Sequence, residues 1–345
     1  MIASKPAYER ILLIRTDRIG DLVLSTPAIA SFRRSWPNAR IEALVSDYNE
    51  PVLRYNRDID GLHVLARSAS REQARALASH LGEGTDLAVA LAPRTADYRL
   101  ALWSRAPRRL GYVYRRRYLS RVAARVMLTQ HGISEADPDL ADRYPDRPIA
   151  HEVHQVLALV RLAGGDVLTD ALVLDVGEEA RAFAAHLVPE GSIGLNLAPR
   201  WFERDFGAGA VAELIVRLAA EHPGVLVTYG SDVVAEAAQV RAAVDTPRVR
   251  WLGQADALNW AAAIGRCAVL VTVDCGAVHV AAAQGVPVIG VYERRYYRLT
   301  SQEWSPWRVP CVVLCKPPVG ASPQPLIDDV AGGARALLSQ PAPAA

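Results

Sequence analysis

The sequence predicts an α/β protein made of two doubly wound domains with parallel sheets. Short apolar runs rich in β-branched residues alternate with amphipathic stretches along the whole chain, as in sheets that helices cover on both faces. At 345 residues the chain is long for one core and sufficient for two. Its composition, 51% hydrophobic and 22% charged, is that of a globular protein.

In the first half of the chain, apolar runs predict strands and helical periodicity predicts the helices between them. The expected strands are Arg10–Thr16, Arg40–Ser46, Gly61–Leu65 and Asp86–Ala92. The expected helices are Leu22–Trp36, Ser70–Leu81, Ala96–Arg105, Tyr118–Thr129 and His151–Ala163. A loop rich in proline and aspartate, Gly132–Pro148, separates the last two helices.

The second half repeats the alternation. Its expected strands are Ser192–Leu197, Gly224–Tyr229, Arg248–Leu252, Val269–Val273 and Pro287–Tyr292. Its expected helices are Val211–Glu221, Val234–Val244, Asn259–Arg266, Ala277–Gln284 and Leu326–Leu338. We therefore expect an N-terminal domain over residues 1–170, a linker region over 171–191, a C-terminal domain over 192–322, and a helix with a loose tail over 323–345. Ligands bind at the carboxyl ends of parallel strands, so the predicted active site is a cleft between the domains.

Basic residues are concentrated in the segment Arg94–Arg125, although the net charge of the chain is only +2. This segment contains ten arginines and a single acid, Asp97, and tyrosine and tryptophan residues lie between the arginines. The arginines are Arg94, Arg99, Arg105, Arg108, Arg109, Arg115, Arg116, Arg117, Arg121 and Arg125. Such a patch attracts phosphates, sugar acids or an anionic membrane surface. Single-stranded nucleic acid and an ordinary solvated helix face are the alternatives.

The sequence favours a cytoplasmic protein whose membrane contact, if any, is peripheral. The first residues lack the apolar core of a signal peptide, and no apolar run approaches the roughly 20 residues that span a bilayer. Four cysteines in a chain of this length predict no disulfide framework. Cys311 and Cys315 have poor spacing for a metal site and no nearby histidine, so we expect free thiols.

A turn in the second half is the clearest candidate for ligand binding. Between two apolar runs, Asp274, Cys275 and Gly276 precede a helix of small residues. Gly276 permits close approach of a ligand to the backbone, and the N-terminus of the helix is a ready phosphate site. His279, one turn into the helix, either contacts phosphate or holds the turn by hydrogen bonding.

A second candidate turn lies near the start of the chain. The first expected strand ends at Thr16, and residues 17–20 deliver Asp21 to the start of a helix. The G-x-G-x-x-G fingerprint is absent there, which argues against a dinucleotide-dependent dehydrogenase. Asp21 is either a helix N-cap or a carboxylate that faces the cleft. The two roles are compatible, because an acid held by the helix dipole stays ionised and can accept a proton.

These motifs give the chain a family resemblance. Arg15–Ala28, followed by Ser31–Ile41, resembles the opening of glycosyltransferase family 9, the ADP-heptose:lipopolysaccharide heptosyltransferases and their relatives. Thr85–Ala92, running into Arg108–Gly111, is similar to the family's later N-domain pattern. Asp274–Pro287 resembles its Asp-Ser/Thr-Gly-x-x-His-x-Ala-Ala signature. The likeness extends from about Arg10 to Leu314, with the motifs in the family's order.

The resemblance implies a GT-B architecture, in which two Rossmann-like domains face each other across a cleft. It also implies inverting, metal-independent transfer from a nucleotide-activated sugar, with a heptose from ADP-heptose as the expected donor, and no cofactor. Asp21 matches the family's general base, a role worth roughly 10²–10⁴-fold in rate. The leaving nucleotide diphosphate would be stabilised by Arg204 and by the helix N-terminus at Cys275, Gly276 and Ala277.

The resemblance also assigns further contacts. Asp274 and His279 match positions beside the donor, and Glu236 loosely matches an acid that holds the nucleotide ribose. The expected acceptor is a phosphorylated or acidic glycolipid of a lipopolysaccharide core or a related surface glycan, built at the inner membrane; nucleic acid is not an expected partner. In this fold the N-terminal domain binds the acceptor. The candidate acceptor contacts are Arg18, Arg94, Arg99, Arg115 and Arg116.

Three departures from the family pattern concern the donor. Cys275 replaces a serine or threonine, Arg204 replaces a lysine, and Glu293-Arg294-Arg295 replaces a Gly-Pro-Thr. These departures leave the donor sugar and nucleotide open. They also leave two alternatives to a glycosyltransferase: a non-catalytic relative that binds glycan or nucleotide, and a sugar-nucleotide epimerase of the same architecture.

Overall fold

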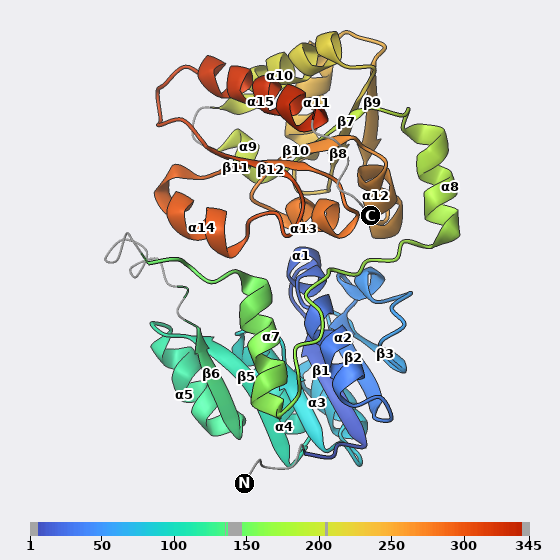
Figure 1. Cartoon of the computed structure of the whole chain (residues 1–345), viewed down its shortest axis with the longest axis vertical. Coiled ribbons are helices and arrows are strands. Elements are labelled where there is room, and N and C mark those ends of the chain that lie inside the picture. The colour runs from blue at the N-terminus through green and yellow to red at the C-terminus, as the bar shows by residue number, and fades with distance from the viewer. Residues whose placement is uncertain (1–5, 135, 137–146, 204–205, 340–345) are drawn as a thin grey trace. The chain divides into compact units, whose positions relative to one another are not determined.

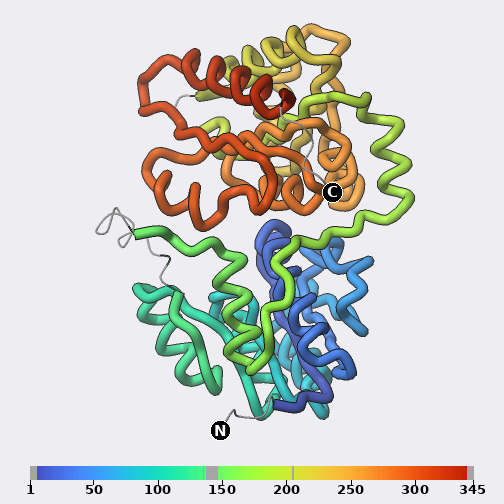
Figure 2. Tube along the Cα trace, in the orientation of Figure 1, coloured from blue at the N-terminus to red at the C-terminus, as the bar shows by residue number. Residues whose placement is uncertain are grey.

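The computed structural model describes residues 6–134, 136, 147–203 and 206–339. The chain divides into two compact units, Met1–Asp175 and Val176–Ala345. Within the described residues each unit contains one six-stranded sheet (Figure 1), and every pairing between strands is parallel. The colour gradient in Figure 2 shows that the chain completes the first unit before it enters the second.

In the first unit the strand order is β3-β2-β1-β4-β5-β6. The strands are β1 (Arg10–Arg15), β2 (Arg40–Ser46), β3 (Gly61–Leu65), β4 (Leu87–Ala90), β5 (Arg108–Tyr114) and β6 (Gln130–Ser134). The central strands contain runs of buried aliphatic residues, Ile11–Ile14 in β1 and Leu87–Ala90 in β4, because helices cover both faces of a parallel sheet. The edge strands β3 and β6 are half-exposed.

The helices of the first unit form two layers around this sheet (Figure 1). They are α1 (Ile19–Val23), α2 (Thr26–Ser35), α3 (Arg71–Leu81), α4 (Thr95–Trp103), α5 (Tyr118–Met127) and α7 (Glu152–Ala163), with a 3-10 turn, η1, at Glu50–Val52. Helices α2 and α7 pack on each other on one face, and α3, α4 and α5 pack in sequence on the other. The second layer forms a core with the buried side chains of β1 and β4.

In the second unit the strand order is β12-β11-β10-β7-β8-β9. The strands are β7 (Ile193–Leu197), β8 (Val225–Tyr229), β9 (Val249–Gly253), β10 (Val269–Val273), β11 (Val288–Tyr292) and β12 (Cys311–Cys315). The helices are α8 (Gly177–Leu187), α9 (Pro199–Phe202), α10 (Gly207–Glu221), α11 (Val234–Ala243), α12 (Ala257–Gly265), α13 (Gly276–Ala283), η2 (Arg294–Tyr296), α14 (Tyr297–Glu303) and α15 (Gln324–Leu338). Helix α10 packs with α11 and α15, and α12 packs with α8 and α13.

The predicted α/β class with two parallel sheets is confirmed, and the nine predicted strands are present to within two residues at each end. Strands β5, β6 and β12 and helices α8, α9 and α14 were not predicted. Helix α8 lies inside the segment expected to be a linker, and most of the loop expected at 132–148 lies outside the described residues. The helix expected over Leu22–Trp36 is two helices, α1 and α2. The second begins with Pro27 in its first turn, where proline's missing N–H costs no hydrogen bond.

Within the described ranges, none of the helices combines the length and the apolar character that crossing a membrane requires.

Candidate active site

In the first unit, the carboxyl end of β1 carries Asp21. Helix α1 begins at Ile19 with Arg18 as its N-cap residue, so Asp21 lies inside the first turn. The N-cap alternative for Asp21 was therefore wrong. A carboxylate at this third helical position is still stabilised by the helix dipole. The side chain is 23% exposed, which leaves it reachable from solvent.

A buried arginine holds this turn together. Arg15, the last residue of β1, is 2% exposed and donates from Nε to Asp17 at 3.0 Å and from Nη1 to Ser25 and the Leu91 carbonyl, both at 2.9 Å. Its Nη2 lies 3.9 Å from Oδ1 of Asp21. Burial opposes the charge, yet the neighbouring carboxylates raise the pKa of Arg15 well above its ordinary value. Arg15 therefore stays cationic and fixes the carboxyl end of β1.

A distant glutamate completes this cluster. Glu152, at the start of α7, is 1% exposed and accepts hydrogen bonds from Arg15 at 3.3 Å and from the Tyr112 hydroxyl at 2.5 Å. Burial raises the pKa of Glu152 to about 7, against the charge of Arg15. One guanidinium is thus shared among Asp17, Asp21 and Glu152. Of these three acids, Asp21 is the most exposed.

A second buried carboxyl lies beside the cluster. Asp97 of α4 has no exposed surface and accepts a hydrogen bond of 2.5 Å from the Thr16 hydroxyl. Its other oxygen, Oδ2, has no hydrogen-bond partner among the described residues. Burial, and then the charge of Asp17, raise the pKa of Asp97 to about 7. The carboxyl ends of β1 and β4 are therefore rich in acids, and burial raises the pKa of two of them, Asp97 and Glu152.

The arginines expected to contact the acceptor do not all lie at the carboxyl ends of the strands. Arg18 and Arg94 are exposed N-cap residues of α1 and α4. Arg115 and Arg116 are exposed in the turn after β5, so these four follow the carboxyl ends of β1, β4 and β5. Arg99 instead lies along α4, with its guanidinium 5.8 Å from the Trp103 ring.

The arginine-rich segment is not one continuous basic surface. Arg108 and Arg109 lie at the amino end of β5, about 20 Å along the strand from its other end. Arg108 donates to the carbonyls of Leu162 and Ala163, at 2.7 and 3.1 Å. Arg109 donates to the carbonyls of Met127 and Ala106, at 2.9 and 2.7 Å. These two arginines stabilise loops and helix ends instead of extending the patch.

In the second unit, the predicted turn links β10 to α13. Cys275 is the N-cap residue of α13 in extended backbone conformation, and its side chain does not cap the helix within the part that the structure describes. The thiol lies 3.3 Å from the Thr272 hydroxyl and 3.5 Å from Nδ2 of Asn196. Burial raises its pKa, so the thiol stays protonated. The first turn of α13 lies at Gly276 and Ala277, and the N-terminus of a helix is a favourable place for an anion.

Two cations that the sequence analysis did not select lie at this end of the sheet, and one of them, Arg200, contacts the turn. Arg200 of α9 forms an ion pair with the Asp274 carboxylate and donates to its carbonyl. Lys316, after β12, is 3% exposed and donates to the carbonyl of Glu203 at 2.5 Å and to the Glu293 carboxylate at 3.1 Å. Arg200 follows β7, which is the neighbour of β10 in the sheet. Asp274 is therefore held from an adjacent strand.

The other predicted donor residues lie in three different environments. His279 in α13 is 4% exposed. Glu236 is half-buried in the first turn of α11, after the carboxyl end of β8. Arg204 lies outside the described residues. Among the residues that are described, no group of three or more histidine, cysteine, aspartate or glutamate side chains is arranged to hold a metal ion.

The segment that departs from the family pattern lines a hollow. Glu293, Arg294 and Arg295 follow the carboxyl end of β11, and together with Lys316 they border a space of about 240 Å³. Three apolar residues complete the lining: Pro317, Pro318 and Val319. The hollow lies at the same edge of the sheet as the Asp274 turn.

Comparisons with known proteins decide the family. The model of glycosyltransferase family 9 (heptosyltransferase) matches residues 140–326, which is more than half of the 345 residues. The chain belongs to glycosyltransferase family 9. Membership identifies it as a glycosyltransferase. In sequence, no curated protein matches the chain.

Solved structures of similar fold agree with the family. A glycosyl transferase of family 9 from Veillonella parvula is 21% identical, with a TM-score of 0.79 over 97% of this chain and 99% of that one. ADP-heptose lps heptosyltransferase II of E. coli is 19% identical, with a TM-score of 0.70 over 95% and 98%. An E. coli heptosyltransferase with ADP-2-deoxy-2-fluoro heptose is 15% identical, with a TM-score of 0.65 over 93% and 98%. At these identities the likeness establishes the fold, and the GT-B class is confirmed.

The candidate site contains residues that the sequence reasoning did not select. Arg15 stands in the first motif, but its role depends on contact with Glu152, which is 137 positions away. For Arg200 and Lys316, the sequence contains one feature each that could have indicated a role in the site. Arg200 follows a buried strand in the segment Ala198-Pro-Arg-Trp, and Lys316 is one of only two lysines in the chain.

Proposed function

We propose that the chain transfers a heptose from ADP-heptose onto a phosphorylated or acidic lipid-linked acceptor of a lipopolysaccharide core, with inversion and without a metal. The observation that carries the proposal is the placement of Asp21. This carboxylate is partly exposed at the carboxyl end of the central strand β1, and a buried arginine that stays charged holds it there. A fixed carboxylate that solvent can reach is what a general base requires.

In the proposed reaction, Asp21 accepts the proton of the acceptor hydroxyl as its oxygen bonds to the anomeric carbon. The bond from that carbon to the phosphate oxygen breaks, and ADP leaves with the electron pair. Attack from the face opposite the leaving group inverts the configuration. Asp17 and Glu152 are more deeply buried than Asp21, so we assign them to holding Arg15 and not to proton transfer.

The second unit is proposed to bind the donor. The N-terminus of α13 at Cys275, Gly276 and Ala277 faces the developing charge on the diphosphate, which helix N-termini stabilise. Arg204 adds positive charge, as predicted from sequence. Asp274 lies beside the sugar, where Arg200 holds it in place. The remaining donor contacts are Glu236 on the ribose and His279.

The first unit is proposed to bind the acceptor. Arg18, Arg94, Arg115 and Arg116 are exposed after the carboxyl ends of β1, β4 and β5, where they would meet phosphate or sugar-acid groups. The expected contact of Arg99 with the acceptor stays a prediction, because Arg99 lies along α4 and not after the end of a strand. Such an acceptor is amphipathic, so we infer a cytoplasmic protein in peripheral contact with the inner membrane.

Mass spectrometry of the acceptor tests this function. Incubation with ADP-heptose and a phosphorylated lipid-core acceptor should add one heptose and release one ADP. Asp21→Asn should lower kcat by at least about 10²-fold, because the amide cannot accept the proton. Asp47→Asn is the matched control: Asp47 lies at the carboxyl end of β2 and pairs with Arg67 at the surface. Its kcat should stay within about twofold.

A panel of ADP-, GDP-, UDP- and dTDP-linked sugars in a thermal-shift assay tests the donor separately. A ligand at a hundred times its Kd should stabilise the protein by about 2.7 kcal/mol. The proposal fails if no sugar nucleotide is consumed in the presence of acceptor. If a sugar linked to a nucleotide other than ADP gives the thermal shift, the donor named in the proposal is wrong.

A further inference from the structure

Helix α5 exposes a row of apolar side chains to solvent. Tyr118, Leu119, Val122 and Val126 are 71%, 88%, 59% and 71% exposed. Single exposed apolar residues are common on protein surfaces, but four on one helix of ten residues are not. This apolar stripe therefore calls for an explanation that the catalytic role does not supply.

The apolar stripe is not the packing face of the helix. At about 100° per residue, its four side chains fall within an arc of roughly 100°. Ala124, which is fully buried, lies almost diametrically opposite. On that opposite side, α5 packs on α4 and β5, and Ala123 and Met127 contact the core. The helix thus has one apolar face that is satisfied by the sheet and a second that is not.

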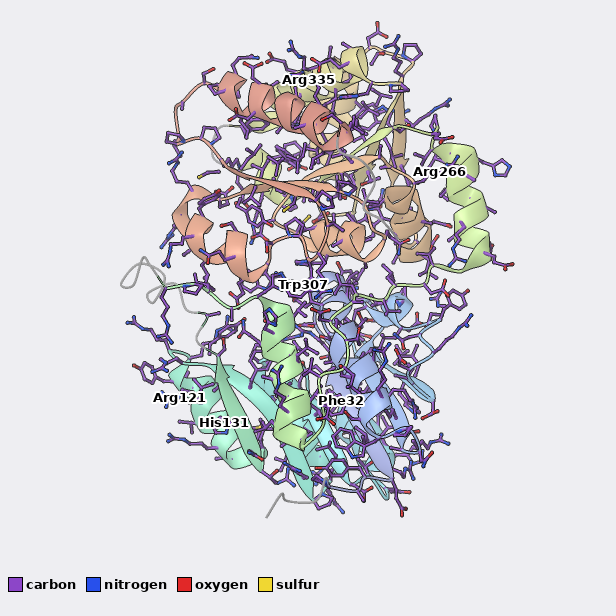
Figure 3. The ribbon with its side chains drawn as sticks, viewed as in Figure 1. Phe32, Arg121, His131, Arg266, Trp307 and Arg335 are labelled. Carbon is purple, nitrogen blue, oxygen red and sulfur yellow. The ribbon has the colours of Figure 1, made fainter. Side chains whose placement is uncertain are left out.

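Positive charge lies before the apolar stripe and along one side of it. Arg115, Arg116 and Arg117 precede the helix and are exposed. Arg121 and Arg125 lie along one flank of the stripe, and Figure 3 labels Arg121 on the outside of the unit. The sequence has no acidic residue from Arg115 to Ser134. An apolar stripe with arginines beside it is the pattern of helices that lie in the interface of an anionic bilayer.

Other occupants fit this surface less well. A twofold contact with a second copy would bring the arginines of both copies together, and like charges oppose such a contact. Single-stranded nucleic acid stacks its bases on aromatic rings, whereas three of the four stripe residues are aliphatic. Anionic lipid satisfies both the charge and the apolar side chains.

We propose that α5 docks the enzyme on an anionic lipid surface, with the apolar stripe at the boundary between headgroups and acyl chains and the arginines at the phosphates. Helix α5 starts at the carboxyl end of β5, two strands or about 10 Å from β1. Docking would therefore hold the Asp21 edge of the sheet close to lipid-linked acceptors. The inference deepens the membrane contact of the proposed function, on which it rests, by assigning that contact to α5, and it holds whichever sugar is transferred.

Vesicle sedimentation with the full chain tests this proposal. The wild type should bind vesicles of phosphatidylglycerol and phosphatidylcholine and should bind pure phosphatidylcholine at least about tenfold more weakly. The variant L119S/V122S/V126S should bind the anionic vesicles at least about tenfold more weakly. A control variant, F183S/V216S/V234S, removes three exposed apolar side chains from the second unit and should bind within about twofold of wild type.

A second variant separates charge from apolar contact. R121Q/R125Q should weaken binding by about fivefold for each arginine removed, and wild-type binding should fall as salt rises. These positions are on the surface, so circular dichroism should show all variants folded. Absence of binding to anionic vesicles overturns the proposal, as does unchanged binding of both α5 variants. A wild-type dimer that L119S/V122S/V126S converts to monomer also overturns it and assigns the stripe to self-association.

Discussion

The carboxyl ends of the two sheets share a topology but differ in chemistry. In the first unit, Asp17, Asp21 and Glu152 surround one buried arginine. In the second unit, the corresponding end of the sheet offers a helix N-terminus at Gly276 and two cations, Arg200 and Lys316, that pair with Asp274 and Glu293. Carboxylates around a buried arginine suit proton transfer, and a helix N-terminus suits a leaving diphosphate. The proposed transfer reaction would take its base from the first of these and the stabilisation of its leaving group from the second.

The largest effect is expected from removing the cation of the acid-rich edge. Arg15→Met leaves the carboxylates around it without compensation, and breaking a buried ion pair costs about 3–5 kcal/mol. Hydrogen exchange of peptides from β1 and β4 should report this loss of stability. Arg67→Met is the control, because Arg67 pairs with the exposed Asp47 and surface pairs contribute about 0–1 kcal/mol. Equal effects of the two changes would show that Arg15 does not organise the edge.

A smaller change in the free energy of unfolding is expected when the pH is raised. Burial raises the pKa of Asp97 to about 7 from the ordinary 3.8, so its contribution to stability is complete below about pH 4. That contribution is lost as the pH rises through 7. Urea unfolding at pH 5 and pH 8 should show the wild type losing at most about 3 kcal/mol more than Asp97→Asn.

The pKa of Asp60 is shifted in the opposite direction to that of Asp97, so its contribution to stability has the opposite dependence on pH. Burial acts to raise its pKa, but the Ile41 amide and Arg33 outweigh that effect and lower it. Its contribution is therefore present above the ordinary pKa and lost as the pH falls. Parallel pH profiles for wild type and Asp97→Asn would contradict the assignment of a buried protonated carboxyl to the first unit.

Much of this comparison could be predicted from sequence, because the informative residues are local. A strand, a turn and a helix placed Asp21 and Asp274 at the carboxyl ends of buried strands, and periodicity was sufficient for that. Strand β5 was missed because Arg108 and Arg109 were interpreted as part of a basic surface. Their aliphatic neighbours Leu110 and Val113 are in fact buried in the sheet.

The residues that hold the two edges could not be predicted in the same way. Arg15 depends on Glu152, and Lys316 depends on the carbonyl of Glu203, 113 positions away. Such contacts arise only when the sheet brings distant segments together. The sequence does not show whether an arginine will be buried among several carboxylates, like Arg15, or exposed to solvent, like Arg116.

The division of labour between the two edges is tested most directly by measuring ADP affinity and turnover on the same two variants. Isothermal titration should give Asp21→Asn the wild-type Kd for ADP, while its kcat falls at least about 10²-fold. Arg200→Ala should raise the Kd for ADP by about tenfold, or about 1.4 kcal/mol, because Asp274 and the start of α13 lose their support. A weakened Kd in Asp21→Asn, or unchanged ADP binding in Arg200→Ala, would contradict the account.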